Sequence, residues 1–133
     1  EGVFPVISPA EFAAALTAFV RRVRTLGAIP VLLTPPAVDV PNAPERGRIA
    51  EFAQATRDVA AAEDTILVDV FARFAALGNG GVPWGLMNDP FHPNATGHAA
   101  LALELATVLG LDPVDSRVLP KLRADVAAGR LNP

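Results

Sequence analysis

The sequence has no cysteine and only two serines, Ser8 and Ser116, in 133 residues. The absence of cysteine excludes disulfides and cysteine-ligated metals, and it leaves the redox compartment undetermined. No apolar run approaches the roughly 18 to 20 residues that a membrane-spanning helix needs. We expect Ser8 to cap a helix, and Ser116 also stands near an expected helix start.

The sequence also has no large excess of either charge, because 11 basic and 14 acidic residues leave a formal net charge of −3. The basic residues are scattered or stand late in an expected helix, so they form no basic patch of the kind that binds nucleic acid. Hydrophobic residues make up 51% of the chain, which argues against intrinsic disorder. The length fits a single domain over residues 1–133.

The stretch "SPAEFAAALTAFVRRVRTLG", residues 8–27, carries the clearest helix signals. Ser8 is a natural N-cap, Pro9 suits the first helical position, and Glu11 completes a capping box. Gly27 can end the helix. One face should be buried, since the apolar residues recur at helical spacing. That stripe consists of Phe12, Leu16, Phe19, Val20, Val23 and Leu26.

Helical and strand-like segments alternate along the rest of the chain. Two short apolar runs without polar alternation, residues 28–36 and 65–71, favour parallel strands that are covered on both faces. Further helices are expected through residues 49–60, from Asn94 to about Gly110, and less clearly over residues 118–126. This order predicts a parallel α/β sheet with helices on both faces. Because two strands are too few for such a sheet, more sheet should come from outside the chain.

Both histidines and an Asp-x-x-His spacing lie in "MNDPFHPNATGHAALALELA", residues 87–106. In a tight turn before a helix, the carboxylate of Asp89 can accept a hydrogen bond from one ring nitrogen of His92. The other nitrogen is then free to act as a general base. Because the stretch follows a buried strand, it should lie near the carboxyl end of the sheet, where open α/β folds place their sites.

Three other interpretations of these motifs are open. Asp89 and Asn94 could simply be helix caps, with His92 a polar surface residue. Asp89, His92 and His98 could bind a metal, but two histidines six residues apart with one aspartate match no common zinc spacing. The sequence "GNGG" at residues 78–81 could suggest a phosphate loop, but it has no lysine and no capped helix after it.

The longer string "DPFHPNATGHAALALEL" resembles the last conserved block of the SGNH (GDSL-type) esterase and lipase superfamily. The block's pattern is Asp-x-x-His-Pro-Asn, a short gap, Gly-His and an apolar helix. The order of elements over residues 8–110 is also similar to the second half of that family. The residues that match are Asp89, His92, Pro93, Asn94, Gly97 and His98.

The resemblance implies a three-layer α/β/α, flavodoxin-like fold, of which this chain would be the C-terminal portion. It also implies that His92 is the general base and acid of a Ser-His-Asp triad and that Asp89 orients it. Asn94 would cap the helix, Gly97 would allow close packing, and His98 would be structural. The family's Gly-Asp-Ser block and its two oxyanion-hole blocks do not occur in this sequence.

We therefore expect a serine hydrolase of carboxylic esters, acetyl or short-acyl, that needs no cofactor or metal. Its substrate would be a small-molecule or glycan ester, with Trp84 and Phe91 as walls of the pocket. The nucleophile would come from a missing N-terminal half or from a second chain, so this chain alone should be inactive. The alternatives are a catalytically empty binding or structural fragment of the same fold and an unrelated flavodoxin-like ligand-binding domain.

Overall fold

The computed structural model describes residues 7–78, 84–111 and 119–128. Ser116 and residues 79–83, which include most of the "GNGG" sequence, lie outside this part of the chain. In chain order the elements are α1 (Pro9–Thr25), β1 (Val31–Leu33), η1 (Val40–Asn42), η2 (Pro44–Arg46), α2 (Ile49–Ala62), β2 (Ile66–Val68), α3 (Val70–Leu77), η3 (Trp84–Leu86), α4 (Ala95–Val108) and α5 (Leu119–Ala127).

Helix α1 begins and ends as its sequence predicts. The Ser8 hydroxyl accepts a hydrogen bond from the Glu11 N–H at 3.2 Å, and the Glu11 carboxylate accepts one from the Ser8 N–H at 2.8 Å. Both halves of the capping box are thus present, with proline at the start of the helix. After the helix, Gly27 takes a φ of +75°, a conformation that favours glycine.

The sheet consists of two parallel strands in the described residues, with Val31 opposite Ile66 and Leu33 opposite Val68. Each strand has three residues, which is shorter than the sequence predicts. The Thr34 N–H continues the ladder to the Val68 carbonyl at 3.1 Å, but Pro35 has no N–H with which to extend it. The second strand ends because Asp69 caps α3, accepting a hydrogen bond from the Ala72 N–H.

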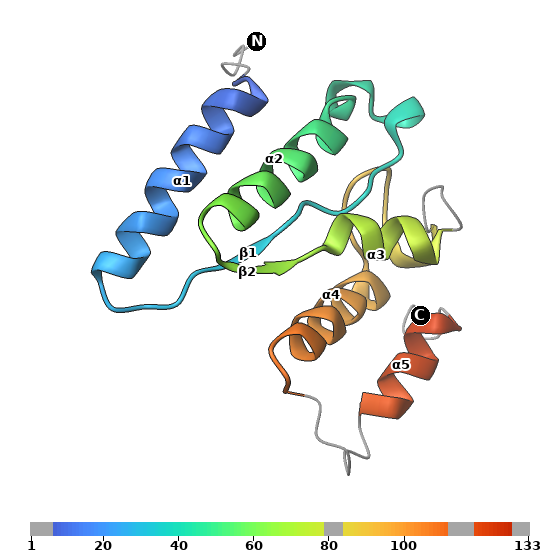
Figure 1. Ribbon diagram of the computed structural model, residues 1–133. Coiled ribbons are helices and arrows are strands. Elements are labelled where there is room, and N and C mark those ends of the chain that lie inside the picture. The colour runs from blue at the N-terminus through green and yellow to red at the C-terminus, as the bar shows by residue number, and fades with distance from the viewer. Residues whose placement is uncertain (1–6, 79–83, 112–118, 129–133) are drawn as a thin grey trace.

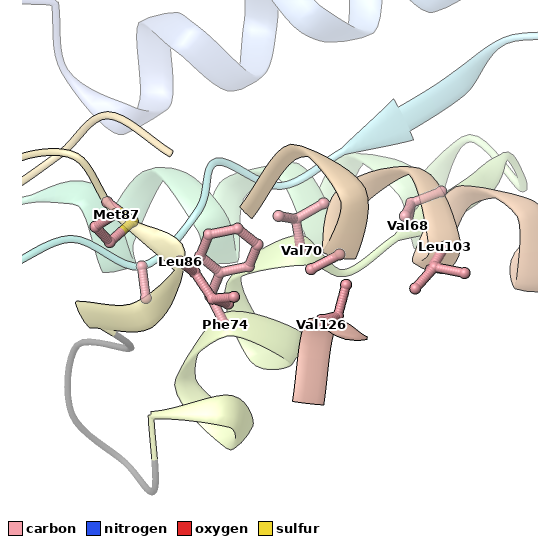
Figure 2. Close-up of a cluster of buried hydrophobic side chains, with 9 residues drawn as sticks. Val68, Val70, Phe74, Leu86, Met87, Leu103 and Val126 are labelled. Carbon is pink, nitrogen blue, oxygen red and sulfur yellow. The ribbon is translucent and has the colours of Figure 1, made fainter. Parts of the chain in front are cut away.

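Helices cover both faces of this small sheet (Figure 1). On one face α1 and α2 pack around Val20, Leu32, Val59 and Ala60. On the other face, α3, α4 and α5 enclose a larger cluster around the fully buried Val68 and Phe74 (Figure 2). The predicted parallel α/β architecture, with helices on both faces, is confirmed.

The predicted burial of the α1 stripe is only partly correct. Val20 is fully buried, whereas Phe19 is 62% and Leu26 is 69% exposed. Within the described residues α1 packs chiefly on α2, so one side of its apolar face has no cover. Nearby Ile29 and Leu33 are also exposed, and β1 pairs only with β2 in this part of the chain.

No described helix is long and apolar enough to cross a membrane.

Candidate active site

The candidate site lies on the turn between η3 and α4, which folds back on itself. Met87 and Pro93 form an antiparallel bridge, and the Asn88 N–H donates to the His92 carbonyl at 2.8 Å. These contacts close a loop of five residues from Asn88 to His92. Its two polar side chains with functional potential, Asp89 and His92, are therefore held on one short, closed segment.

The side chains of Asp89 and His92 contact one another directly. The Nδ1 atom of His92 lies 2.6 Å from Oδ2 of Asp89. The other carboxylate oxygen, Oδ1, accepts hydrogen bonds from the N–H groups of Phe91 at 2.9 Å and His92 at 2.8 Å. Because an ionised carboxylate can only accept, the proton lies on Nδ1. In the neutral ring, Nε2 then carries the lone pair.

The surroundings of Asp89 stabilise its ionised form. The pKa of its carboxyl group is lowered from 3.8 to about 2, first by the backbone N–H of Phe91 and then by the side chain of His92. The side chain of His92 is 63% exposed. The site therefore presents a solvent-accessible imidazole whose inner nitrogen is held by a permanently charged acceptor at neutral pH.

This lowered pKa predicts how the turn responds to acid. A depressed carboxyl pKa stabilises the folded turn above the unfolded value near 4, and that contribution is lost as the pH falls through about 2. We expect the side-chain carboxyl ¹³C resonance of Asp89, followed by NMR, to show its protonation step below pH 4, with a midpoint near 2. A midpoint at or above pH 4 would contradict the hydrogen bonds that the carboxylate accepts. The variant Asp89→Asn has no carboxyl group at this position, so the step should be absent from its spectrum.

Asn94 and Gly97 fix the turn to the start of α4. The Asn94 carbonyl oxygen accepts a hydrogen bond from the Gly97 N–H at 3.0 Å, and its amide donates to the carbonyls of Gly85 and Met87. A Cβ atom on Gly97 would lie 2.2 Å from the carbonyl oxygen of Leu86. The predicted cap at Asn94 and the predicted close packing at Gly97 are both present.

The turn also docks on the loop that leaves the carboxyl end of β1. The Asp39 N–H donates a hydrogen bond to the Pro90 carbonyl at 2.8 Å. The carboxylate of Asp39 in turn accepts a hydrogen bond from the Asn42 side chain at 2.5 Å, which holds this loop in shape. The pair of Asp89 and His92 therefore lies beside the carboxyl end of the sheet, as open α/β folds predict.

A shallow hollow of about 270 Å³ opens beside the imidazole. It is lined by Pro36, Val38, Arg46, Ile49, Phe91 and His92. The Phe91 ring lies against the imidazole with 4.1 Å between centroids. Trp84 instead lines a neighbouring hollow of about 460 Å³, which shares Val38 and Ile49 with the first. The structure therefore brings Phe91, but not Trp84, into the same hollow as His92.

Sequence reasoning missed Arg46. Its guanidinium carbon lies 4.7 Å from the centroid of the Phe91 ring, although 45 positions separate these two residues in the chain. Only the loop between β1 and α2 brings them together, and nothing in the sequence around Arg46 signals this.

The other candidates from the sequence occupy less suitable positions. His98 is exposed on the first turn of α4. Ser8 is fully used by its capping box. No cluster of three or more potential metal ligands occurs in residues 7–78, 84–111 and 119–128.

These features define a class, namely a parallel α/β domain that carries an oriented Asp–His pair before a helix at the carboxyl end of its sheet. Residues 3–100 match the model of the GDSL-like lipase/acylhydrolase family. The chain therefore belongs to the GDSL-like lipase/acylhydrolase family.

Solved structures show the same fold. The chain is 29% identical to LAE5, an alpha/beta hydrolase enzyme from the metagenome of Lake Arreo, Spain, with a TM-score of 0.67 over 80% of this chain and 50% of that one. A catalytic mutant of Axe2, an acetylxylan esterase from Geobacillus stearothermophilus, is 25% identical, with a TM-score of 0.69 over 83% and 51%. No curated protein matches the sequence with statistical significance.

A lipase/acylhydrolase from Enterococcus faecalis matches at 23% identity and a TM-score of 0.62, over 80% of this chain and 53% of that one, and supports the fold alone. The chain thus spans about half the length of the solved structures that it matches. This coverage confirms the predicted partial α/β/α domain and explains why the sheet has so few strands.

Proposed function

We propose that this chain supplies the base and the orienting acid of a serine hydrolase that cleaves carboxylic esters. The observation that carries the proposal is the 2.6 Å contact between Nδ1 of His92 and Oδ2 of Asp89, on a turn that presents the imidazole to solvent. Membership in the GDSL-like lipase/acylhydrolase family supports the same chemistry. His92 and Asp89 would then be two members of a Ser-His-Asp triad.

The reaction would proceed through an acyl-enzyme. Nε2 of His92 takes the proton of a serine hydroxyl while the serine oxygen attacks the ester carbonyl. The imidazolium returns that proton to the alcohol oxygen as the carbon–oxygen bond breaks. Water then attacks the acyl-enzyme, with His92 accepting its proton and giving it to the serine as the acid leaves. Asp89 stays ionised throughout and stabilises the imidazolium.

The nucleophilic serine would come from outside this chain, either from the missing half of the domain or from a second chain. Ser8 already uses its hydroxyl in the cap of α1. The open edge of β1 and the exposed side chains of Phe19, Leu26 and Ile29 would form part of the surface where that segment packs. Burying such apolar area supplies the main driving force for association.

The substrate would carry an acetyl or another short acyl group. The acetylxylan esterase Axe2 is one of the similar structures, which favours a small-molecule or glycan ester. The hollow beside His92 is small and open, and Phe91 forms its wall. Trp84 is 54% exposed and lines the neighbouring hollow. It would contact a part of the substrate further from the ester bond.

A fluorophosphonate probe tests this proposal. We expect denaturing intact-mass analysis of the complete enzyme to show one covalent adduct, on a serine outside residues 1–133. The adduct should fail to form when His92 is replaced by alanine, because the serine is then not activated. Labelling of Ser8 or Ser116 would contradict the proposed roles of Asp89 and His92, and the absence of any adduct would indicate an inactive fragment.

A further inference from the structure

Arg46 places a positive charge in the hollow beside His92. The guanidinium carbon of Arg46 lies 4.7 Å from the centroid of the Phe91 ring. The imidazole of His92 lies against the same ring, with 4.1 Å between the two ring centroids. Arg46 and His92 therefore contact the same aromatic ring and line the same hollow. The other lining residues of this hollow, Pro36, Val38 and Ile49, are apolar.

The charge on Arg46 has only a weak counter-charge. Its Nε atom lies 3.9 Å from Oε1 of Glu45, and both side chains are about half exposed. The contrast with Arg48 is clear, since that guanidinium makes two hydrogen bonds with Glu51 at 3.0 and 2.8 Å. Arg46 therefore keeps donors that can bind an incoming group.

The carboxylates of Glu45 and Asp89 do not line this hollow. Glu45 lines an adjacent hollow together with Arg46, Arg48 and Phe52, and it is not among the residues that line the hollow beside His92. Both oxygens of Asp89 already accept hydrogen bonds from the Phe91 and His92 N–H groups and the imidazole. Among the residues that line this hollow, Arg46 therefore carries the cationic side chain, and none of them is a carboxylate.

We propose that Arg46 determines specificity for esters whose alcohol part carries an anionic group, such as a carboxylate. Resting on the proposed function, this assigns the hollow to the leaving alcohol, because Nε2 of His92 must reach the alcohol oxygen that it protonates. The anion of that alcohol would bind the fork of guanidinium donors, a geometry suited to carboxylates. The reaction is the one proposed above: the serine oxygen bonds to the acyl carbon, and the bond between that carbon and the alcohol oxygen breaks.

Matched acetyl esters test the assignment. The anionic substrates are 3- and 4-acetoxybenzoate, and the neutral ones are their methyl esters, so each pair differs mainly in the charge on the alcohol part. We expect the complete enzyme to show a ratio of kcat/KM, anionic over neutral, about fivefold above that of Arg46→Gln, as fits a half-exposed charge pair. Because both enzymes cleave the same two esters, intrinsic reactivity cancels in this comparison. The preference should decline as the salt concentration rises.

The variants distinguish a specificity role from a structural one. Arg46→Lys should keep part of the preference, and Arg48→Gln, which changes a paired neighbouring arginine, should leave it intact. If Arg46→Gln keeps the wild-type ratio while cleaving both esters, the specificity assignment is overturned and the proposed hydrolysis stands. If the wild-type enzyme cleaves neither ester and forms no fluorophosphonate adduct, the proposed function fails and the assignment fails with it.

Discussion

Replacing His92 with alanine should reduce kcat of the complete enzyme on a short acyl ester by about 10⁶-fold, as expected for the proposed base of a Ser-His-Asp triad. The alanine removes the only group on this turn that can take the serine proton and return it to the leaving alcohol. KM should change little, because the imidazole acts mainly in the transition state. Steady-state hydrolysis of a chromogenic acetyl ester measures both constants.

His98→Ala is the matched control, since it removes the chain's other histidine from an exposed position on α4. This variant should keep at least half of the wild-type kcat. Equal activity of His92→Ala and wild type would assign the turn a purely structural role and favour the interpretation as a catalytically empty fragment. Equal losses in both variants would point to general damage to α4 instead of removal of the base.

Replacing Gly97 with alanine should lower the free energy of unfolding by about 3 kcal/mol, near the upper end of what overpacking costs. The added Cβ would stand 2.2 Å from the Leu86 carbonyl oxygen and 2.9 Å from Cβ of Pro93. Both neighbours belong to the segment that carries the active-site turn, so neither can yield without moving it. Urea unfolding of the complete protein, followed by circular dichroism, measures the loss.

Gly85→Ala provides the control for this change, because a Cβ at Gly85 would meet no atom within 4 Å. Its effect should stay within about 0.5 kcal/mol, as for other surface substitutions. We also expect Gly97→Ala to reduce kcat, because α4 and the turn before it must separate. A variant as stable as wild type would show that the close approach of Gly97 to Leu86 can relax without cost.

The sequence predicted the pair of Asp89 and His92 because the whole arrangement is local. Four consecutive residues, Asp89 to His92, contain both partners and the two N–H groups that hold the carboxylate. Capping residues such as Ser8 and Asn94 are equally local, since each bonds to an N–H three positions further on. Patterns of this range can be recognised without knowledge of the tertiary structure.

What the sequence could not predict depends on long-range packing. Arg46 reaches Phe91 only through the loop between β1 and α2, and Trp84 lines a hollow formed by residues from that loop, α2 and α3. The apolar spacing of α1 correctly predicted a helix, but it could not show that Phe19 would be left without cover. Periodicity identifies a face, whereas its burial depends on which other segment is present.

The closed loop from Asn88 to His92 has a consequence for how such an enzyme can evolve. Because the proposed base, its proposed orienting acid and their hydrogen bonds lie on one segment, substitutions elsewhere in the domain can change substrate contacts without changing the hydrogen bonds of the imidazole. The segment that supplies the serine then has to meet only a spatial requirement. It must place one hydroxyl beside Nε2 of His92, and the contact with Asp89 already sets the direction of that nitrogen. A poorly fitting partner segment should therefore lower the rate while leaving the pH dependence of hydrolysis unchanged.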